Sequence, residues 1–190
     1  MRLVVLMLCV AVAGGCVQMA KVGPGDVVIR DRMSAKLESP WNRYESPHAG
    51  RAEIWTIDGL SLDRVDFYAG IAQGETLVEP KAGQDKALPR FRAKMEPQEI
   101  VEMVDASIAL DGSVFRLDRL APSRFADGDG FRFEFVHVRK VDELTLRGIG
   151  YGTVRDDRLY LVLFRAPRLY YFARNVAQFE EVARSVRIVR

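Results

Sequence analysis

GFRFEFVHVRKVDELTLRGIGYGTVRDDRLYLVLFRA, residues 130–166, is the stretch that decides the fold. Three runs of β-branched, aromatic and leucine residues are separated by charged or turn-forming segments, a pattern typical of an antiparallel meander. The last two runs are joined by the polar segment 155–158, which suits a tight chain reversal. Because successive side chains of a strand point to opposite faces, Phe131, Phe133 and Phe135 share one face. The sequence therefore predicts three strands with an apolar face that needs a cover.

Two helices with apolar faces are predicted. Residues 95–108 carry Pro97 in the first turn and apolar residues at helical spacing. Asn175 and Gln178 have the spacing of a capping box, and the apolar positions of residues 175–187 continue the helical period. We expect this C-terminal helix to cover the apolar face of the meander. The predicted fold class is therefore α+β, with an antiparallel β-sheet covered by an internal helix (about 96–108) and a C-terminal helix (about 175–187).

Further strands and a loop are predicted before the meander. The strand-like runs are residues 27–33, 52–58, 65–72 and 114–124. Residues 74–88 are polar and have no apolar period, which predicts an exposed loop. The meander and these strands fit within one domain.

The first sixteen residues, MRLVVLMLCVAVAGGC, contain one arginine, a short apolar run and small residues before Cys16. Such a run is typical of a signal peptide. Residues 13–16 resemble the lipobox of bacterial lipoproteins, which implies that Cys16 is the site of lipid attachment and begins the mature chain. Attachment of more than one acyl chain gives stable membrane anchoring. The residues after Cys16 include no Asp of the kind linked to inner-membrane retention, so the resemblance implies the outer membrane, facing the periplasm, in a Gram-negative source.

The predicted organisation is a signal peptide (1–15), a lipidated tether (16–25) and a single α+β domain (26–190). Cys9 lies in the signal peptide, so the mature chain has no pair of cysteines for an internal disulfide. The 28 Lys and Arg residues nearly balance the 26 Asp and Glu residues. This balance gives no electrostatic reason to expect a nucleic-acid partner.

The sequence offers few candidates for catalysis or metal binding. Its two histidines are His48 and His137. A metal site needs several convergent ligands, and His137 lies in a strand pattern that favours packing or outward exposure. Neither histidine has a serine and a carboxylate at a spacing that indicates a catalytic triad. We therefore predict no catalytic residue, no cofactor and no metal ligand.

Two groups of residues are candidates for contact with a partner or a ligand. The proline-bounded segment 39–51 is predicted to be a loop that exposes Trp41, Tyr44 and His48. Alternating glycines leave one face of a predicted strand without side chains: Gly148, Gly150 and Gly152. Either a neighbouring side chain packs closely over these glycines or a ligand does, and we favour packing.

Several segments resemble those of uncharacterised proteobacterial lipoproteins: EIWTIDG, LPRFRAKMEPQEIVEMVDAS, GFRFEF, GYGTVRDDRLYLVLFRAP and FEEVARSVRI. More distantly, a late strand of the type LYLVLFRAP followed by a terminal helix resembles the PsbP/Mog1-like α/β sandwich class. That class consists generally of accessory and binding proteins, so the resemblance implies a fold without transferring a function.

These observations lead to one functional hypothesis with two alternatives. The leading one is a membrane-anchored, periplasm-facing lipoprotein that binds another component of the cell envelope without catalysis. The second is a binder of a small apolar or amphipathic ligand in a groove between sheet and helix, and the third is an envelope hydrolase that uses His48. A filled core between sheet and helix favours the first over the second.

Overall fold

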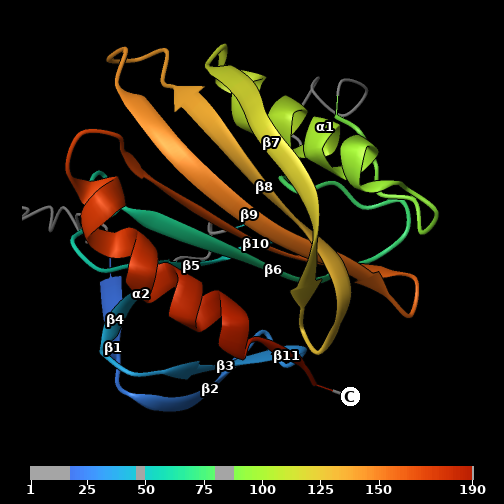
Figure 1. Cartoon of the computed structure of the whole chain (residues 1–190), viewed down its shortest axis with the longest axis horizontal. Helices are drawn as coiled ribbons and strands as arrows, with labels where there is room; N and C mark the ends of the chain where they lie inside the picture. The colour runs from blue at the N-terminus through green and yellow to red at the C-terminus, as the bar shows by residue number, and fades with distance from the viewer. Residues whose placement is uncertain (1–17, 46–49, 80–87, 190) are drawn as a thin grey trace, which may run out of the picture.

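The computed structural model describes residues 18–45, 50–79 and 88–189 and contains two β-sheets. The main sheet is antiparallel, in the order β1-β4-β5-β6-β10-β9-β8-β7 (Figure 1). Its strands are β1 (Gln18–Val22), β4 (Trp41–Glu45), β5 (Glu53–Thr56), β6 (Arg64–Ile71), β7 (Val114–Phe125), β8 (Gly128–Val138), β9 (Thr145–Arg155) and β10 (Arg158–Pro167). The smaller sheet has the order β11-β3-β2 and consists of β2 (Gly25–Ile29), β3 (Met33–Leu37) and β11 (Arg187–Ile188).

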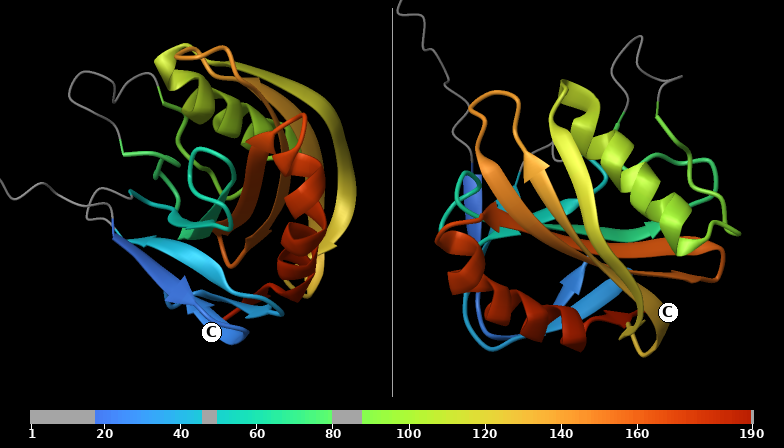
Figure 2. Two further views of the ribbon diagram at one scale, coloured as in Figure 1. Left: turned by 90° about the vertical axis from the view of Figure 1, so that its left-hand side faces the viewer. Right: turned by 45° about the horizontal axis from the view of Figure 1, so that its top comes forward.

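Each face of the main sheet has its own apolar core. Helix α1 (Pro97–Ile108), which is followed by the 3-10 turn η1 (Ala109–Asp111), packs on one face. Helix α2 (Tyr171–Ser185) and the smaller sheet pack on the other (Figures 1 and 2). The main sheet is thus the central layer between two covers, and it twists strongly across its width (Figure 2).

The predicted α+β fold class is wrong, because it gives the helices too large a share of the structure. Strands make up 49% of the described residues and helices 19%, so this part of the chain is mostly antiparallel β-sheet. A second sheet and two separate cores replace the single sheet covered by two helices. The short strands of the second sheet were missed because a turn at residues 30–32 divides the predicted strand 27–33 into β2 and β3.

The predicted meander is confirmed as β8, β9 and β10, but its predicted cover is wrong. Phe131, Phe133 and Phe135 belong to the core beneath α1. Helix α2 instead packs on the opposite face, where Phe179 stacks on Phe164 with ring centroids 5.0 Å apart. The sequence indicated an apolar face on β8 but did not show that β9 and β10 are apolar on both faces.

The start of the first helix follows the prediction, and the start of the second does not. The N-terminus of α1 has a capping box, in which the Glu99 carboxylate accepts a hydrogen bond from the Glu96 backbone N–H at 2.9 Å. Helix α2 begins at Tyr171, so Asn175 lies inside the helix. The Asn175 amide is buried and donates to the Asp58 carboxylate at 2.9 Å, which explains a polar residue at that position.

The N-terminal expectations are tested only from residue 18. The predicted signal peptide and Cys16 lie outside the described residues. The expected tether ends earlier than predicted, because residues 18–22 form β1 and pair with β4 at the edge of the main sheet. Among the described helices, none has the length and hydropathy needed to cross a bilayer.

Candidate functional site

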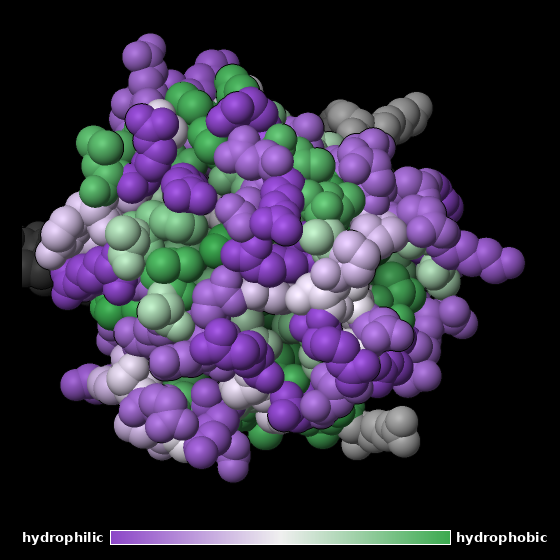
Figure 3. Space-filling model, in the orientation of Figure 1, coloured by the Kyte–Doolittle hydropathy of each residue, from purple (hydrophilic) through white to green (hydrophobic). Residues whose placement is uncertain are grey.

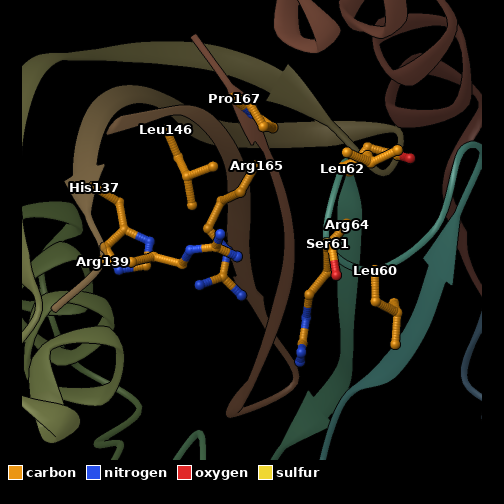
Figure 4. A pocket seen from close by; sticks show the side chains of 10 residues that line it. Leu60, Ser61, Leu62, Arg64, His137, Arg139, Leu146, Arg165 and Pro167 are labelled. Atoms are coloured by element: carbon orange, nitrogen blue, oxygen red, sulfur yellow. The ribbon is translucent and has the colours of Figure 1, made fainter. Parts of the chain in front are cut away.

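A pocket of about 150 Å³ opens at the end of the main sheet where β8 and β10 finish and β6 and β9 begin. We call it the His137 pocket. Its charged and titratable lining consists of Asp63, Arg64, His137, Arg139 and Arg165. In Figure 4 the side chains of His137, Arg139 and Arg165 point toward one another, and Arg64 comes from the neighbouring strand β6. The pocket lies on the α1 side of the sheet, beyond the apolar core.

The turn before β6 positions one wall of the pocket. The buried Asp63 carboxylate accepts hydrogen bonds from the backbone N–H groups of Ile57 and Asp58, both at 2.7 Å. The Thr56 hydroxyl donates to the same carboxylate at 2.9 Å. These bonds close the β5–β6 connection and fix the point at which Arg64 enters the sheet. Burial raises the pKa of Asp63, although the three hydrogen bonds oppose this effect.

A buried ion triad lies beside the pocket, and two of its members, Arg64 and Arg165, line the pocket. Asp66 is fully buried and bridges Arg64 at 2.6 Å and Arg165 at 2.7 Å. Burial alone would raise the pKa of Asp66, but the charges of the two guanidinium groups outweigh burial and hold this pKa below its ordinary value. With one carboxylate between two guanidinium groups, the triad keeps one excess positive charge.

His137 is the least satisfied polar side chain of the pocket. It is 5% exposed, and neither ring nitrogen has a hydrogen-bond partner among the described residues. The buried Nε of Arg165 also lacks a partner in this part of the chain. Burial and, to a smaller extent, the charge of Arg165 lower the pKa of His137 to about 4. Three buried polar atoms are therefore unpaired beside one cavity, an unusual concentration for a folded protein.

Arg139 adds a third guanidinium group at the rim. Its Nε donates to Asp142 at 3.0 Å within the β8–β9 connection. The pocket thus contains donors from three arginines around an unpaired imidazole. Such an arrangement can bind an anionic oxygen, because guanidinium and imidazolium groups donate strong charge-assisted hydrogen bonds.

The described residues contain no metal-ligand cluster, and His137 is not paired with a nucleophile among them. Residues 18–45, 50–79 and 88–189 contain no group of three His, Cys, Asp or Glu side chains suited to a metal ion. Because both His137 nitrogens are unpaired within these ranges, no serine is held by this histidine as a nucleophile would be.

The glycine face predicted as a possible ligand site is filled by aromatic rings. Phe135, Phe133 and Phe131 are the direct cross-strand partners of Gly148, Gly150 and Gly152. A Cβ atom on any of these glycines would come within 2.2–2.4 Å of the opposite phenyl ring. The packing interpretation is therefore correct, and this face leaves no room for a ligand.

The predicted loop 39–51 is partly a strand. Trp41 begins β4 and is 1% exposed. Its ring centroid lies 6.3 Å from that of Trp55, in the core on the α2 side. Tyr44 is half-buried and packs against the core on the α1 side. His48 and Cys16 lie outside the described residues. The structure therefore brings neither aromatic residue to an exposed binding loop.

The residues of the His137 pocket were not predicted as a site. Asp66 and Arg165 each interrupt a run of apolar strand residues, and this is the signal that the sequence contains. Two opposite charges at interior strand positions are costly unless they meet, so their presence indicates a buried pair. Their sequence separation of 99 residues conceals the pairing.

Exposed apolar residues lie at the same end of the sheet as the pocket. Val141, in the β8–β9 connection, is 85% exposed, and Leu169, between β10 and α2, is 91% exposed. The two connections are joined by a hydrogen bond from the Arg168 N–H to the Thr145 carbonyl oxygen. Elsewhere, the face seen in Figure 3 is largely hydrophilic, with hydrophobic residues in scattered patches.

Comparison with known proteins identifies the fold. One of thirteen matching chains of solved structures is the cyanobacterial PsbP (CyanoP) from Synechocystis sp. PCC 6803, determined in solution. It has a TM-score of 0.56 and 10% sequence identity, and the match covers 96% of this chain and 98% of that one. The chain therefore has a PsbP-like fold. No known protein family and no curated protein matches its sequence.

Proposed function

We propose that this protein is a membrane-anchored, non-catalytic binding protein of the bacterial cell envelope whose His137 pocket holds an acidic group of another envelope component. The observation behind this proposal is the buried His137 side chain, with both nitrogens unpaired, in a pocket shared by three arginines. The lipobox-like residues 13–16 and the resemblance to proteobacterial lipoproteins support the anchor.

A carboxylate or phosphate oxygen complements the pocket better than a neutral group does. It would accept hydrogen bonds from Arg165 Nε and from a protonated His137, both of which lack partners among the described residues. Each unpaired buried donor costs about 1–3 kcal/mol, so pairing both at once favours binding. At about 150 Å³ the pocket admits a single acidic group rather than a large ligand.

The partner is proposed to be a protein because exposed apolar residues lie at the same end of the sheet as the charged pocket. Val141 and Leu169 are exposed at the same end, and Tyr170 beside Leu169 is 60% exposed. Aromatic and aliphatic anchors next to a buried ionic contact are typical of protein interfaces.

His137 provides a direct test of the pocket. We would follow its imidazole resonances by NMR in the full chain with Cys16→Ser, using His48→Gln to assign the two histidines, while adding acetate or inorganic phosphate. Anion binding should raise the pKa of His137 from about 4 by about one unit or more, since an anion favours the protonated ring. An unchanged His137 pKa at saturating anion would contradict the proposal.

Two variants of the rim give effects of opposite sign. Arg139→Gln should weaken anion binding several-fold because it removes one guanidinium group. Asp142→Asn should strengthen binding because it frees Arg139 from its carboxylate. If both variants changed the anion affinity in the same direction, the charge of Arg139 would not be the cause, and the proposed role of the rim would be wrong.

The anchor is tested separately by cell fractionation. Cys16→Ser should move the protein from the membrane fraction to the soluble fraction, since it removes the proposed acylation site. A wild-type distribution would refute the anchor without bearing on the pocket.

A second candidate function rests on a different hollow. Between the start of α1 and strands β7 and β8 lies an open space of about 360 Å³, lined mainly by Pro97, Leu120, Pro122 and Phe131. This groove between helix and sheet suits a small apolar or amphipathic ligand. Binding of a fluorescent fatty acid that Leu120→Asp abolishes would support this function, and absence of binding to the native protein would exclude it.

A further inference from the structure

The His137 pocket has an apolar wall as well as charged groups. Apart from its charged and titratable residues, it is lined by Ser61 and by four apolar residues, Leu60, Leu62, Leu146 and Pro167. Leu146 is buried and lies on the His137 side of the pocket, across from Leu60 and Leu62 of the β5–β6 connection (Figure 4). A lining of this kind suits a ligand that has a charged end and an aliphatic stem.

The three guanidinium groups of the pocket are already engaged by carboxylates. Arg64 and Arg165 share the Asp66 carboxylate, at 2.6 and 2.7 Å. Arg139 pairs with Asp142 in the β8–β9 connection. An incoming anion therefore meets arginines that have spent part of their hydrogen-bonding capacity on the protein itself.

Few buried donors remain for a ligand. Among the described residues, the unpaired buried atoms beside the pocket are Arg165 Nε and the two nitrogens of His137. A carboxylate has two oxygens, which these donors can satisfy together. Phosphate and sulfate have four oxygens, and those turned toward the leucines would lose their water without gaining a donor. The supply of donors therefore favours a carboxylate.

The charges around the pocket are close to balance while His137 is neutral. The three arginines are offset by the carboxylates of Asp63, Asp66 and Asp142. Asp111, exposed in η1, adds a negative charge that acts on His137. One proton taken up by His137 balances the single charge of a carboxylate, whereas a dianion would bring a second charge into a partly buried site without a counter-charge.

We infer that the His137 pocket selects a carboxylate on a short aliphatic stem, the side chain of a glutamate or aspartate of the partner protein, over phosphate and sulfate. This inference rests on the proposed function, because it names the acidic group that the pocket holds. The carboxylate accepts from Arg165 Nε and from His137, and its methylene groups contact the leucines of the wall.

Competition among small anions tests the selection. We would follow the His137 resonances by NMR in the full chain with Cys16→Ser at about pH 5, where the free ring is largely neutral and proton uptake is visible. The probes are sodium propionate, inorganic phosphate and sulfate. Near this pH phosphate carries one charge and sulfate two, so the pair separates the number of oxygens from the charge. Propionate should bind about tenfold or more tightly than either, since it leaves no oxygen without a donor.

The apolar wall is tested by Leu62→Ser. This change should weaken propionate binding about fourfold, the value of one methylene group removed from water, and should leave acetate binding less affected. Val28→Ser is the matched control, because Val28 is 55% exposed on β2 and does not line the pocket. Equal propionate affinities of the two variants would overturn the role of the wall.

Two capped amino acids distinguish a partner's side chain from a free acid. N-acetylglutamate amide should bind as tightly as propionate, and N-acetylglutamine amide should not bind. Binding of propionate without binding of the capped glutamate would overturn the inference in favour of a free carboxylic acid. Phosphate or sulfate binding as tightly as propionate would overturn the selection but leave the proposed function standing. A His137 signal that responds to none of the anions would instead refute the proposed function itself.

Discussion

Replacement of Gly150 by alanine should destabilise the protein because the new methyl group would overlap a buried ring. Gly150 lies on β9 between its cross-strand partners Phe133 and Leu163. A Cβ on Gly150 would be 2.2 Å from two carbons of the Phe133 ring and 2.9 Å from Leu163 Cδ2. Ordinary carbon contacts are about 3.5 Å or longer, so the ring must move by roughly 1.3 Å.

The surroundings of Phe133 leave little space for this movement. The ring is fully buried and lies between those of Phe131 and Phe135, at centroid distances of 6.2 and 5.7 Å. Overpacking of this kind costs about 3 kcal/mol, and the lower entropy of an unfolded chain with alanine offsets about 1 kcal/mol of it. We therefore expect Gly150→Ala to lower the free energy of unfolding by about 2 kcal/mol.

Urea unfolding followed by circular dichroism measures this change. Gly23→Ala is the matched control, because a Cβ at Gly23 meets no atom within 4 Å, and it should change stability by less than about 0.5 kcal/mol. Phe133→Leu in the Gly150→Ala background should cost less than the sum of the two single changes, since the smaller side chain relieves the overlap. Equal stability of Gly150→Ala and Gly23→Ala would refute the interpretation of the glycine face as packed.

Two further predictions concern the buried charges beside the His137 pocket. Asp66→Asn should lower the free energy of unfolding by about 3 kcal/mol because Arg64 and Arg165 lose their shared carboxylate, whereas Asp142→Asn at an exposed pair should change stability little. An unfolded histidine binds its proton near pH 6.5 and folded His137 only near pH 4, so the unfolded state binds more protons between these values. Stability should therefore fall by about 3 kcal/mol as the pH drops through this range, and His137→Gln should lose that part of the pH dependence in urea unfolding at several pH values.

The sequence predicted the elements whose determinants are local. The period of two in Phe131, Phe133 and Phe135 defined β8, and Pro97 with Glu99 located the start of α1. Helix α2 was assigned to the wrong face because charged residues, Arg132 and Glu134, alternate with the phenylalanines of β8, a pattern typical of a strand with one solvent-exposed side. In the structure Arg132 donates to Tyr151 at 2.9 Å and to Glu180 of α2 at 3.0 Å. The polar residues of β8 therefore lie at the edge of a second core rather than in water.

The candidate site depends on contacts that no local pattern encodes. Asp66 and Arg165 meet because β6 and β10 are neighbours in the sheet, although β6 belongs to the first half of the chain and β10 to the last quarter. Trp41 and Tyr44 were misjudged for the related reason that Pro40 and Pro47 suggested a loop, while β1 and β5 on either side pair with residues 41–45 as a strand. Strand order therefore explains why the Asp66–Arg165 pair was not predicted and why Trp41 and Tyr44 were wrongly predicted to be exposed.

Strand order also explains why Arg158 lies far from His137. In an antiparallel sheet the beginning of one strand lies beside the end of its neighbour, so the connections gather at two opposite ends. One end receives the β9–β10 turn and Arg158, and the other receives the β5–β6 and β8–β9 connections that border His137. For this reason, Arg158→Gln should leave the His137 titration unchanged, whereas Arg139→Gln should raise the pKa of His137, because the charge of Arg139 lowers this pKa. An equal shift of the His137 pKa in both variants, measured by NMR titration, would contradict this separation.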